Sequence, residues 1–380
     1  MWKFVFLQTL FWRPFSHGEV IKGLGYAPVP IKADDTTTLP LDDFMSEDAK
    51  PLWGPRGRGD LSLMKALGAN AVRLYGNDPR QDHTSFLNEA KSNGLHVLPG
   101  MSDYPFSQMD GNCMTTSYNC YSQLKDAYLG NLENGWLQSD RSYHPAIRSV
   151  VVINEPELKL PSIDYPSYWL KALLSAIDGV LSAEQEANVT GSLVNLTVTF
   201  SFAYCYACST PSVGHKPGLD MMVALRDAFL SPEDYGYTPI NDLTAFFHTR
   251  FVNSFNSANP ASTLSALFFD HYAAEFPSTP VFQGEFHCWD ESLDQTEEIA
   301  TVLAITESLD LFQGIYYFEW QVRYDKGASE LYFGMFGLGE YSLGTFDFHG
   351  TNFEAWCLVP ITRGDGPNVP SAVYQSIGGS

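Results

Sequence analysis

Two glutamates, Glu155 and Glu285, stand where a sequence would place catalytic carboxylates. Glu155 follows the apolar run VVVIN at 150–154, and Glu285 follows VFQG at 281–284. Each run is short and rich in β-branched or aromatic residues, so each carboxylate is expected at the end of a buried strand, facing a pocket. Two carboxylates on different strands can serve as acid/base and nucleophile at one anomeric carbon, which is the chemistry of a retaining glycosidase.

Asn154 immediately precedes the first glutamate. A side-chain amide at this place can bond a sugar hydroxyl through a hydrogen bond that strengthens in the transition state. The alternative for each glutamate is a solvated carboxylate at a strand end, because a carboxylate near a cleft points to function only probabilistically.

The composition supports a large enzyme and argues against nucleic acid and anionic membranes as partners, whereas a neutral polymer would be indifferent to the charge. The chain has 380 residues and a net charge of −22, which would repel a phosphate backbone or an anionic membrane. Its 8 Trp and 20 Tyr can supply a core and also stacking surfaces for sugars. We therefore predict a polysaccharide or oligosaccharide as partner, no nucleic acid and a monomer. Histidines at metal-ligand spacing are not found in pairs, so no metal and no cofactor are predicted.

Hydrophobic patterning predicts alternating strands and helices. Strands are expected at about 20–26, 71–76, 96–101, 148–154, 196–202, 250–255, 279–286 and 314–320, and helices at about 59–67, 83–91, 123–137, 165–187, 264–276 and 295–309. Eight such units close naturally into a (β/α)8 TIM barrel with all strand C-terminal ends on one face. We predict an α/β fold with one catalytic domain over 20–345, an N-terminal segment at 1–19 and a C-terminal extension at 346–380 packed on the barrel.

This closure assigns further residues to the pocket. Arg73 is expected to hold Glu285 ionised, the alternative being a structural salt bridge. Trp320 is predicted to stack on sugar, and Glu319 to bind a hydroxyl, with a role in the catalytic couple as its alternative. The other strand-end residues predicted to contact substrate are Tyr26, Tyr75, Asp103 and Asn154.

Three more ionisable residues lie close to these segments. Glu157 follows Glu155 beyond a proline and is predicted on the solvated rim. His287 and His144 could tune the site, although lone histidines near apolar segments are more often hydrogen-bonded core or loop residues.

Several features lean towards export. Lys3 is followed by FVFLQTLFW, which is typical of a weak signal sequence, the alternative being an apolar cap on the barrel. Glycosylation sequons begin at Asn188 and Asn195. A secreted or cell-wall location is therefore predicted.

The even number of cysteines, six, fits this prediction. Cys113 and Cys120 are spaced for a local disulfide. Cys205 and Cys208 form a disulfide or two buried thiols, and a long-range bridge between Cys288 and Cys357 is possible.

The Asn-Glu at the end of strand four and the Glu at the end of strand seven resemble the superfamily of (β/α)8 retaining glycosidases. Within it, residues 70–99, with Arg73-Leu74-Tyr75, Asp78-Pro79 and Asp82-His83, are similar to the β-1,3-glucanosyltransferases of fungal cell walls. The stretch 312–338, with Phe318-Glu319-Trp320, is similar to that family's last strand.

The resemblance implies a cleft for β-1,3-glucan, Glu155 as acid/base and Glu285 as nucleophile, with Tyr75, Asn154 and Asp103 as secondary contacts. The chain departs from the family pattern at Tyr26, which is followed by Ala-Pro and not Gln, and at Phe318 and Trp320, where the family has tyrosines. Strand six lacks the tyrosine that usually bonds the nucleophile, which leaves Asn253 or Asn256 as a substitute. We expect hydrolysis of a β-glucan, with transglycosylation or a non-catalytic carbohydrate-binding barrel as alternatives.

Overall fold

A sheet of eight parallel strands forms the centre of the protein in the computed structural model, which describes residues 19–208, 214–287, 292–364 and 366–378. The order of the strands is β3-β2-β1-β8-β7-β6-β5-β4. Their bounds are β1 Ile21–Gly25, β2 Ala71–Arg73, β3 His96–Leu98, β4 Ser149–Asn154, β5 Asn195–Phe200, β6 Phe251–Ser257, β7 Val281–Phe286 and β8 Phe312–Tyr317.

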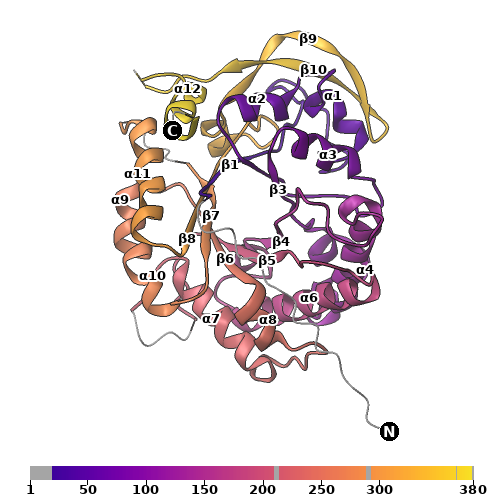
Figure 1. The fold of residues 1–380 in the computed structure, drawn as a ribbon, viewed down its shortest axis with the longest axis vertical. Helices are drawn as coiled ribbons and strands as arrows, with labels where there is room; N and C mark the ends of the chain where they lie inside the picture. The colour runs from indigo at the N-terminus through magenta and orange to yellow at the C-terminus, as the bar shows by residue number, and fades with distance from the viewer. Residues whose placement is uncertain (1–18, 209–213, 288–291, 365, 379–380) are drawn as a thin grey trace.

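The two ends of this sheet meet and close a barrel. Parallel bridges join Val97 to Ile147 and Gly100 to Val151, so β3 pairs with β4. Met101 N–H donates to the Val151 carbonyl at 2.9 Å across the same seam. The predicted (β/α)8 barrel is thus confirmed, with the strands surrounded by helices (Figure 1).

The interior of the barrel is filled by apolar side chains. A buried cluster takes one residue from each of seven strands: Ile21, Ala71, Leu98, Val151, Val252, Phe282 and Tyr316. Gly23 makes room for this layer, because a Cβ atom there would lie 2.2 Å from the Tyr316 ring. The barrel is therefore a packed core, and an open site can form only beyond the strand ends.

Helices cover the outside of the sheet and bury their apolar faces against it. The main ones are α2 Asp60–Ala66, α3 Thr84–Ser92, α4 Tyr121–Asn131, α6 Pro166–Glu186, α7 Leu219–Leu230, α8 Leu243–Arg250, α10 Asp270–Glu275 and α11 Gln295–Ser308; shorter ones are α1 Lys50–Trp53, α5 Pro156–Lys159, α9 Ala261–Leu264 and α12 Val369–Val373. None of the helices in the described ranges is long and apolar enough to be a membrane span.

Some helices differ from the sequence prediction. The helix expected at 264–276 is interrupted by a wider turn at Ser265–Phe269, and α4 ends at Asn131, before the expected 137. Neither α7 nor α8 was predicted. Most of α7 is buried, so its sequence is apolar nearly all round and lacks the periodicity that marks an amphipathic helix.

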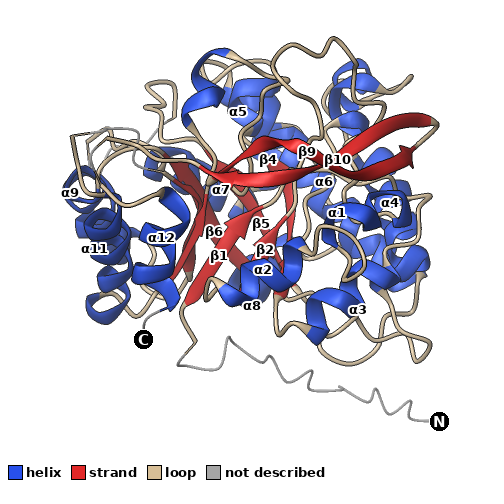
Figure 2. Cartoon of the chain, turned by 90° about the horizontal axis from the view of Figure 1, so that it is seen from above, coloured by secondary structure: helices blue, strands red, loops and turns tan. Residues whose placement is uncertain are grey.

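The sequence analysis also missed a long antiparallel hairpin of β9 Phe336–Phe348 and β10 Thr351–Pro360. His349 and Gly350 connect the strands with φ of 51° and 85°, as a two-residue type I′ turn requires. The hairpin lies over the segment before α1, where Phe348 stacks on Phe44 at 5.4 Å (Figures 1 and 2). The predicted domain limit at residue 345 falls inside β9.

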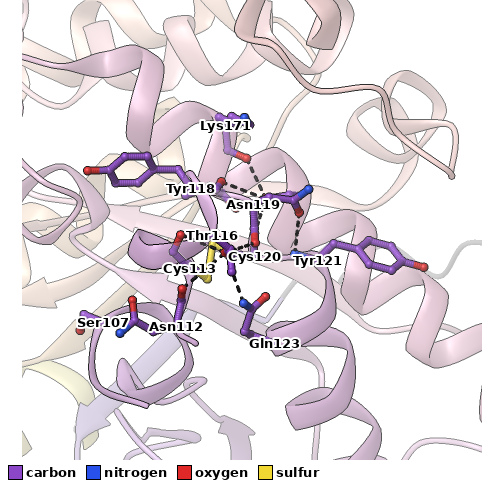
Figure 3. Close-up of a disulfide and its surroundings, with 12 residues drawn as sticks. Ser107, Asn112, Cys113, Thr116, Tyr118, Asn119, Cys120, Tyr121, Gln123 and Lys171 are labelled. Atoms are coloured by element: carbon purple, nitrogen blue, oxygen red, sulfur yellow. Dashed lines mark hydrogen bonds between the residues drawn. A yellow bond between two sulfur atoms is a disulfide. The ribbon is translucent and has the colours of Figure 1, made fainter. Parts of the chain in front are cut away.

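Two disulfides brace the loops that follow the strands. Cys113–Cys120 is present as predicted, and it lies directly before α4 (Figure 3). Gln123, in the first turn of α4, donates to Thr116 at 3.3 Å within the same loop. Cys205 and Cys208, expected as a disulfide or as two buried thiols, form a disulfide. The possible bridge from Cys357 to Cys288 cannot be traced, because Cys288 lies outside the described residues, as does 1–18 of the predicted N-terminal segment.

Candidate active site

A cleft of about 1320 Å³ opens at the C-terminal ends of the barrel strands. Its walls come from loops that follow β1 to β8, which is where the fold collects side chains from distant parts of the chain. The cleft brings together six of the predicted site residues: Tyr75, Asp103, Asn154, Glu155, Glu285 and Glu319.

Glu155 occupies the turn between β4 and α5. Its φ of 52° and ψ of 56° are left-handed, a conformation uncommon for residues other than glycine. The Glu155 N–H donates to the Thr199 carbonyl of β5 at 2.7 Å, and Pro156 then begins α5. The carboxyl Oε1 accepts a hydrogen bond from the Asn256 amide at 3.1 Å. The left-handed backbone of a residue other than glycine is strained, so the surrounding contacts must stabilise it.

Arg73 is the central connector of the site. Its side chain is 1% exposed, and its guanidinium donates to the Asn154 Oδ1 at 2.6 Å and to the Asn256 Oδ1 at 3.1 Å. The same Nη1 lies 3.4 Å from Glu285 Oε1. Gly284 permits this approach, because a Cβ atom there would lie 2.6 Å from Arg73 Nη1. The cation is therefore fixed among Asn154, Asn256 and Glu285.

Glu285 is the second-last residue of β7, and its side chain is 17% exposed. Burial raises the pKa of the Glu285 carboxyl to about 7; Arg73 lowers that pKa, Glu155 raises it, and Lys326 and the Tyr75 hydroxyl lower it further. Arg73 therefore acts in the predicted direction on the pKa of Glu285, but burial outweighs it.

Asn256 of β6 links the two glutamates. Its amide nitrogen donates to Glu155 and also to Asn154 Oδ1 at 3.0 Å, while its oxygen accepts from Arg73. The sequence left Asn253 and Asn256 as alternatives for strand six. Asn253 instead donates to the Tyr272 hydroxyl at 2.8 Å, in the buried layer outside the barrel. Asn256 is the one that reaches the site.

Tyr75 and Glu319 line the cleft beside Glu285. The Arg73 guanidinium lies over the Tyr75 ring at 4.8 Å, and burial together with Glu285 raises the pKa of the phenol well above its usual value. Glu319 is fully buried, and burial raises its carboxyl pKa well above the ordinary value. Neither of its oxygens has a hydrogen-bond partner among the described residues. Glu319 is thus a neutral acid that can donate to a ligand oxygen.

Asp103 lies further out on the same wall. Its carboxylate forms an ion pair with Lys159 at 2.7 Å, and both side chains are about one third exposed. Such a pair in partial contact with water leaves carboxylate oxygens that can accept from sugar hydroxyls.

Tyr26 and Trp320 are not among the cleft-lining residues, which corrects their expected positions. Tyr26 is 1% exposed and donates to Asp60 at 2.9 Å. Trp320 is fully buried between Tyr26 and Phe336. An aromatic ring must expose a face to stack on a sugar, so we assign both side chains to packing.

Glu157, His287 and His144 lie in three different surroundings. Glu157 was expected on the solvated rim but is fully buried, and its Oε1 accepts from Ser201 N–H at 2.7 Å. His287 lines the cleft, and burial lowers its pKa to about 3, so it is a neutral ring there. His144 contacts Asn88 at 3.2 Å and has a structural place outside the cleft.

Within the described ranges, no cluster of three or more His, Cys, Asp or Glu side chains is arranged to hold a metal ion. The groups that line this cleft include carboxyls, amides, phenols and the cations of Arg80, Lys159, Arg323 and Lys326. Such a set can transfer protons, provide a nucleophile and bond hydroxyl groups.

The fold is similar to solved structures of Gas2. A complex of Gas2 with a compound aligns with a TM-score of 0.57 at 13% identity, over 96% of this chain and 66% of Gas2. A second structure is a glutamate-to-glutamine variant of Saccharomyces cerevisiae Gas2p in complex with laminaritetraose and laminaripentaose. It aligns with a TM-score of 0.53 at 13% identity, over 95% of this chain and 63% of that chain. The chain thus spans about two thirds of the Gas2 length.

The AHE enzyme from Alicyclobacillus herbarius aligns with a TM-score of 0.50 at 12% identity, over 87% of this chain and 94% of that chain. No family model matches the sequence, and no curated protein matches it either. At these identities the likeness concerns the fold. The strand order and the structural neighbours together show a (β/α)8 barrel.

Proposed function

We propose that the protein is a retaining glycoside hydrolase that cleaves a β-glucan with β-1,3 linkages. One observation carries the proposal: Glu155 and Glu285 end two different barrel strands in one cleft and are joined through Asn256 and Arg73. Retaining glycosidases use one carboxyl group as acid/base and a second as nucleophile at the same glycosidic bond. We expect the two carboxyls to be about 5–5.5 Å apart, as retention requires.

In the first step, Glu285 attacks the anomeric carbon while Glu155 gives its proton to the leaving oxygen. The bond from carbon to Glu285 forms as the bond to the leaving sugar breaks. In the second step, Glu155 takes a proton from an acceptor hydroxyl, whose oxygen attacks the anomeric carbon and releases Glu285. Water as acceptor gives hydrolysis, and a sugar hydroxyl gives transfer.

The charges around the pair support these roles. Two neighbouring carboxyls titrate as a pair, and a fixed cation decides which of them is ionised when one proton is present. Arg73 lies 3.4 Å from Glu285, whereas the Glu155 carboxyl accepts from a neutral amide, that of Asn256. The raised pKa of Glu285 alone would suggest the opposite roles. Arg73 is a buried cation beside Glu285 that lowers the pKa of this carboxyl, so it favours the ionised form that a nucleophile needs.

The substrate and the location are inferred from the structural neighbours, the cleft residues and the disulfides. The Gas2p variant that shares this fold was solved with laminari-oligosaccharides. The cleft residues Tyr75, Asn154 and Glu319, with Arg73 bonded to Asn154, fit the resemblance seen in the sequence. The altered residue Phe318, which lines the cleft, makes us favour hydrolysis over transfer. The two disulfides support an oxidising, extracellular location.

The test is an assay with laminarin and a panel of other β-glucans and β-mannans. We expect new reducing ends from a β-1,3-glucan, with the β-configuration retained in the first product by NMR. Products longer than the donor would identify a transferase of the same mechanism. Wild-type protein that binds glucan and releases no product would identify a non-catalytic binding barrel and contradict the proposal.

Substitution separates the two roles. Glu285→Gln should abolish turnover of every substrate, because no covalent intermediate can form. Glu155→Ala should keep activity on substrates with activated leaving groups, and azide should rescue it. If azide instead rescued only the Glu285 variant, the roles would be reversed.

A further inference from the structure

Glu157 is a buried carboxyl two residues from the proposed acid/base, and the mechanism above does not use it. It lies in the short helix α5, and its side chain is completely inaccessible. Oε1 accepts from Ser201 N–H at 2.7 Å, while Oε2 has no hydrogen-bond partner among the described residues. Burying a carboxyl costs free energy, so a group held there calls for a reason.

The reason lies in the pairing of β4 with β5. The strands are parallel, Asn154 pairs with Thr199, and Glu155 N–H donates to the Thr199 carbonyl. In a regular parallel ladder, the next bond would run from Ser201 N–H to the carbonyl of Glu155. Glu155 leaves the strand in a left-handed turn, and Ser201 N–H donates to the Glu157 carboxyl. The side chain replaces the missing ladder acceptor.

We propose that Glu157 is a positioning residue: its bond to Ser201 holds the left-handed turn that directs the Glu155 carboxyl into the cleft. The two residues flank Pro156, so the turn is clamped at Glu155 N–H on one side and at the Glu157 side chain on the other. The role rests on the proposed function, because it matters for catalysis only if Glu155 is the acid/base. Ser201 itself lines the cleft, so a loosened clamp would disturb the wall as well.

Two substitutions of similar size distinguish the effect of the hydrogen bond to Ser201 from the effect of filling the buried space. Glu157→Gln keeps an oxygen that can accept from Ser201 N–H, whereas Glu157→Met fills the same buried space without an acceptor. Glutamine is also neutral, as the carboxyl largely is in mild acid, because burial raises the pKa of Glu157 to about 7.

The readout compares kcat/KM on a laminari-oligosaccharide with kcat/KM on a dinitrophenyl β-laminarioside. Cleavage of the second substrate needs no proton from an acid. We expect Glu157→Met to lose about 100-fold on the oligosaccharide and only a few fold on the dinitrophenyl substrate, because a misplaced acid impairs only the step that needs it. Glu157→Gln should stay within a few fold of wild type on both.

Asp178→Asn is the matched control. Asp178 is also fully buried and accepts from backbone N–H groups, those of Ile240 and Asn241, but it lies outside the cleft. This variant should lower the unfolding temperature and leave the ratio of the two kcat/KM values unchanged.

Equal losses on both substrates, or a glutamine variant as impaired as the methionine variant, would overturn the inference. If Glu157→Met fails to fold, the glutamine variant decides alone: normal activity on both substrates supports the clamp, and a selective loss on the oligosaccharide contradicts it. Wild-type protein without glycosidase activity would refute the proposed function, whereas an active wild type with an unaffected Glu157→Met would refute only the positioning role.

Discussion

Replacing Arg73 with methionine tests whether this guanidinium keeps the nucleophile ionised. Arg73 Nη1 lies 3.4 Å from Glu285 Oε1, and the two side chains are 1% and 17% exposed. At an effective dielectric constant of about 20, two unit charges at that distance attract by about 5 kcal/mol. Water entering the space left by the guanidinium would screen part of the loss, so we expect the pKa of Glu285 to rise by about 2 units.

The sign follows from the role of Glu285. Its pKa is about 7 in the native protein, and a nucleophile must be ionised, so activity should be lost as the pH falls through about 7. In Arg73→Met this acid limb should move to about pH 9. Because the ionised fraction falls tenfold per unit, kcat/KM at about pH 6 should drop roughly 100-fold beyond any loss seen at about pH 9.5, measured on the dinitrophenyl β-laminarioside, whose cleavage needs no proton from Glu155.

Initial rates from about pH 4 to 10 would measure the shift, with circular dichroism as a check that the variant is folded. Arg73→Lys is the matched control, since it keeps the charge but cannot serve both Asn154 and Asn256 with the same geometry. It should lose rate while its acid limb stays near that of wild type. A folded Arg73→Met with the wild-type pH profile would refute the reasoning.

Three further predictions concern packing and charge. Gly284→Ala should reduce kcat/KM severely with moderate loss of stability, because the new Cβ would lie 2.6 Å from Arg73 Nη1, and a wild-type rate would contradict this. Trp320→Ala should lower the free energy of unfolding by about 3–5 kcal/mol in denaturant titration, with KM for oligosaccharides nearly unchanged in the folded fraction. Burial raises the pKa of Glu157 from 4.5 to about 7, so its contribution to stability is fully present below about pH 4.5 and is lost as the pH rises through about 7. Calorimetry should therefore find a contribution on the order of 3 kcal/mol that disappears over this range in wild type and is absent in Glu157→Gln.

The barrel and its cleft followed from local sequence patterns. Runs such as VVVIN before Glu155 are buried on both faces, so they are continuously apolar and mark a parallel strand. Because every parallel strand of a closed barrel ends at the same face, strand-end residues converge without any knowledge of distances. That rule brought Tyr75, Asn154, Glu155 and Glu285 to one cleft.

The same rule failed where side-chain direction mattered. Trp320 follows the end of β8, yet its ring points into packing against Phe336 and not into the cleft. The β9–β10 hairpin that supplies Phe336 was not predicted, so nothing in the sequence indicated that the ring would be covered. The sequence signals for the hairpin were weak, because they consisted of a His-Gly turn and a partial alternation of apolar and polar residues along β9.

The sequence by itself determined the eight strands of the barrel, the two glutamates at strand ends and the disulfide Cys113–Cys120, because each depends on local pattern or short spacing. Only the tertiary structure decided that Asn256 and not Asn253 reaches Glu155, and that Glu157 is a buried clamp and not a solvated rim residue. These outcomes depend on the register between β4, β5 and β6 and on the left-handed turn at Glu155. A shift of one residue in a strand turns its side chains to the opposite face, and the register is set by contacts between segments far apart in the chain.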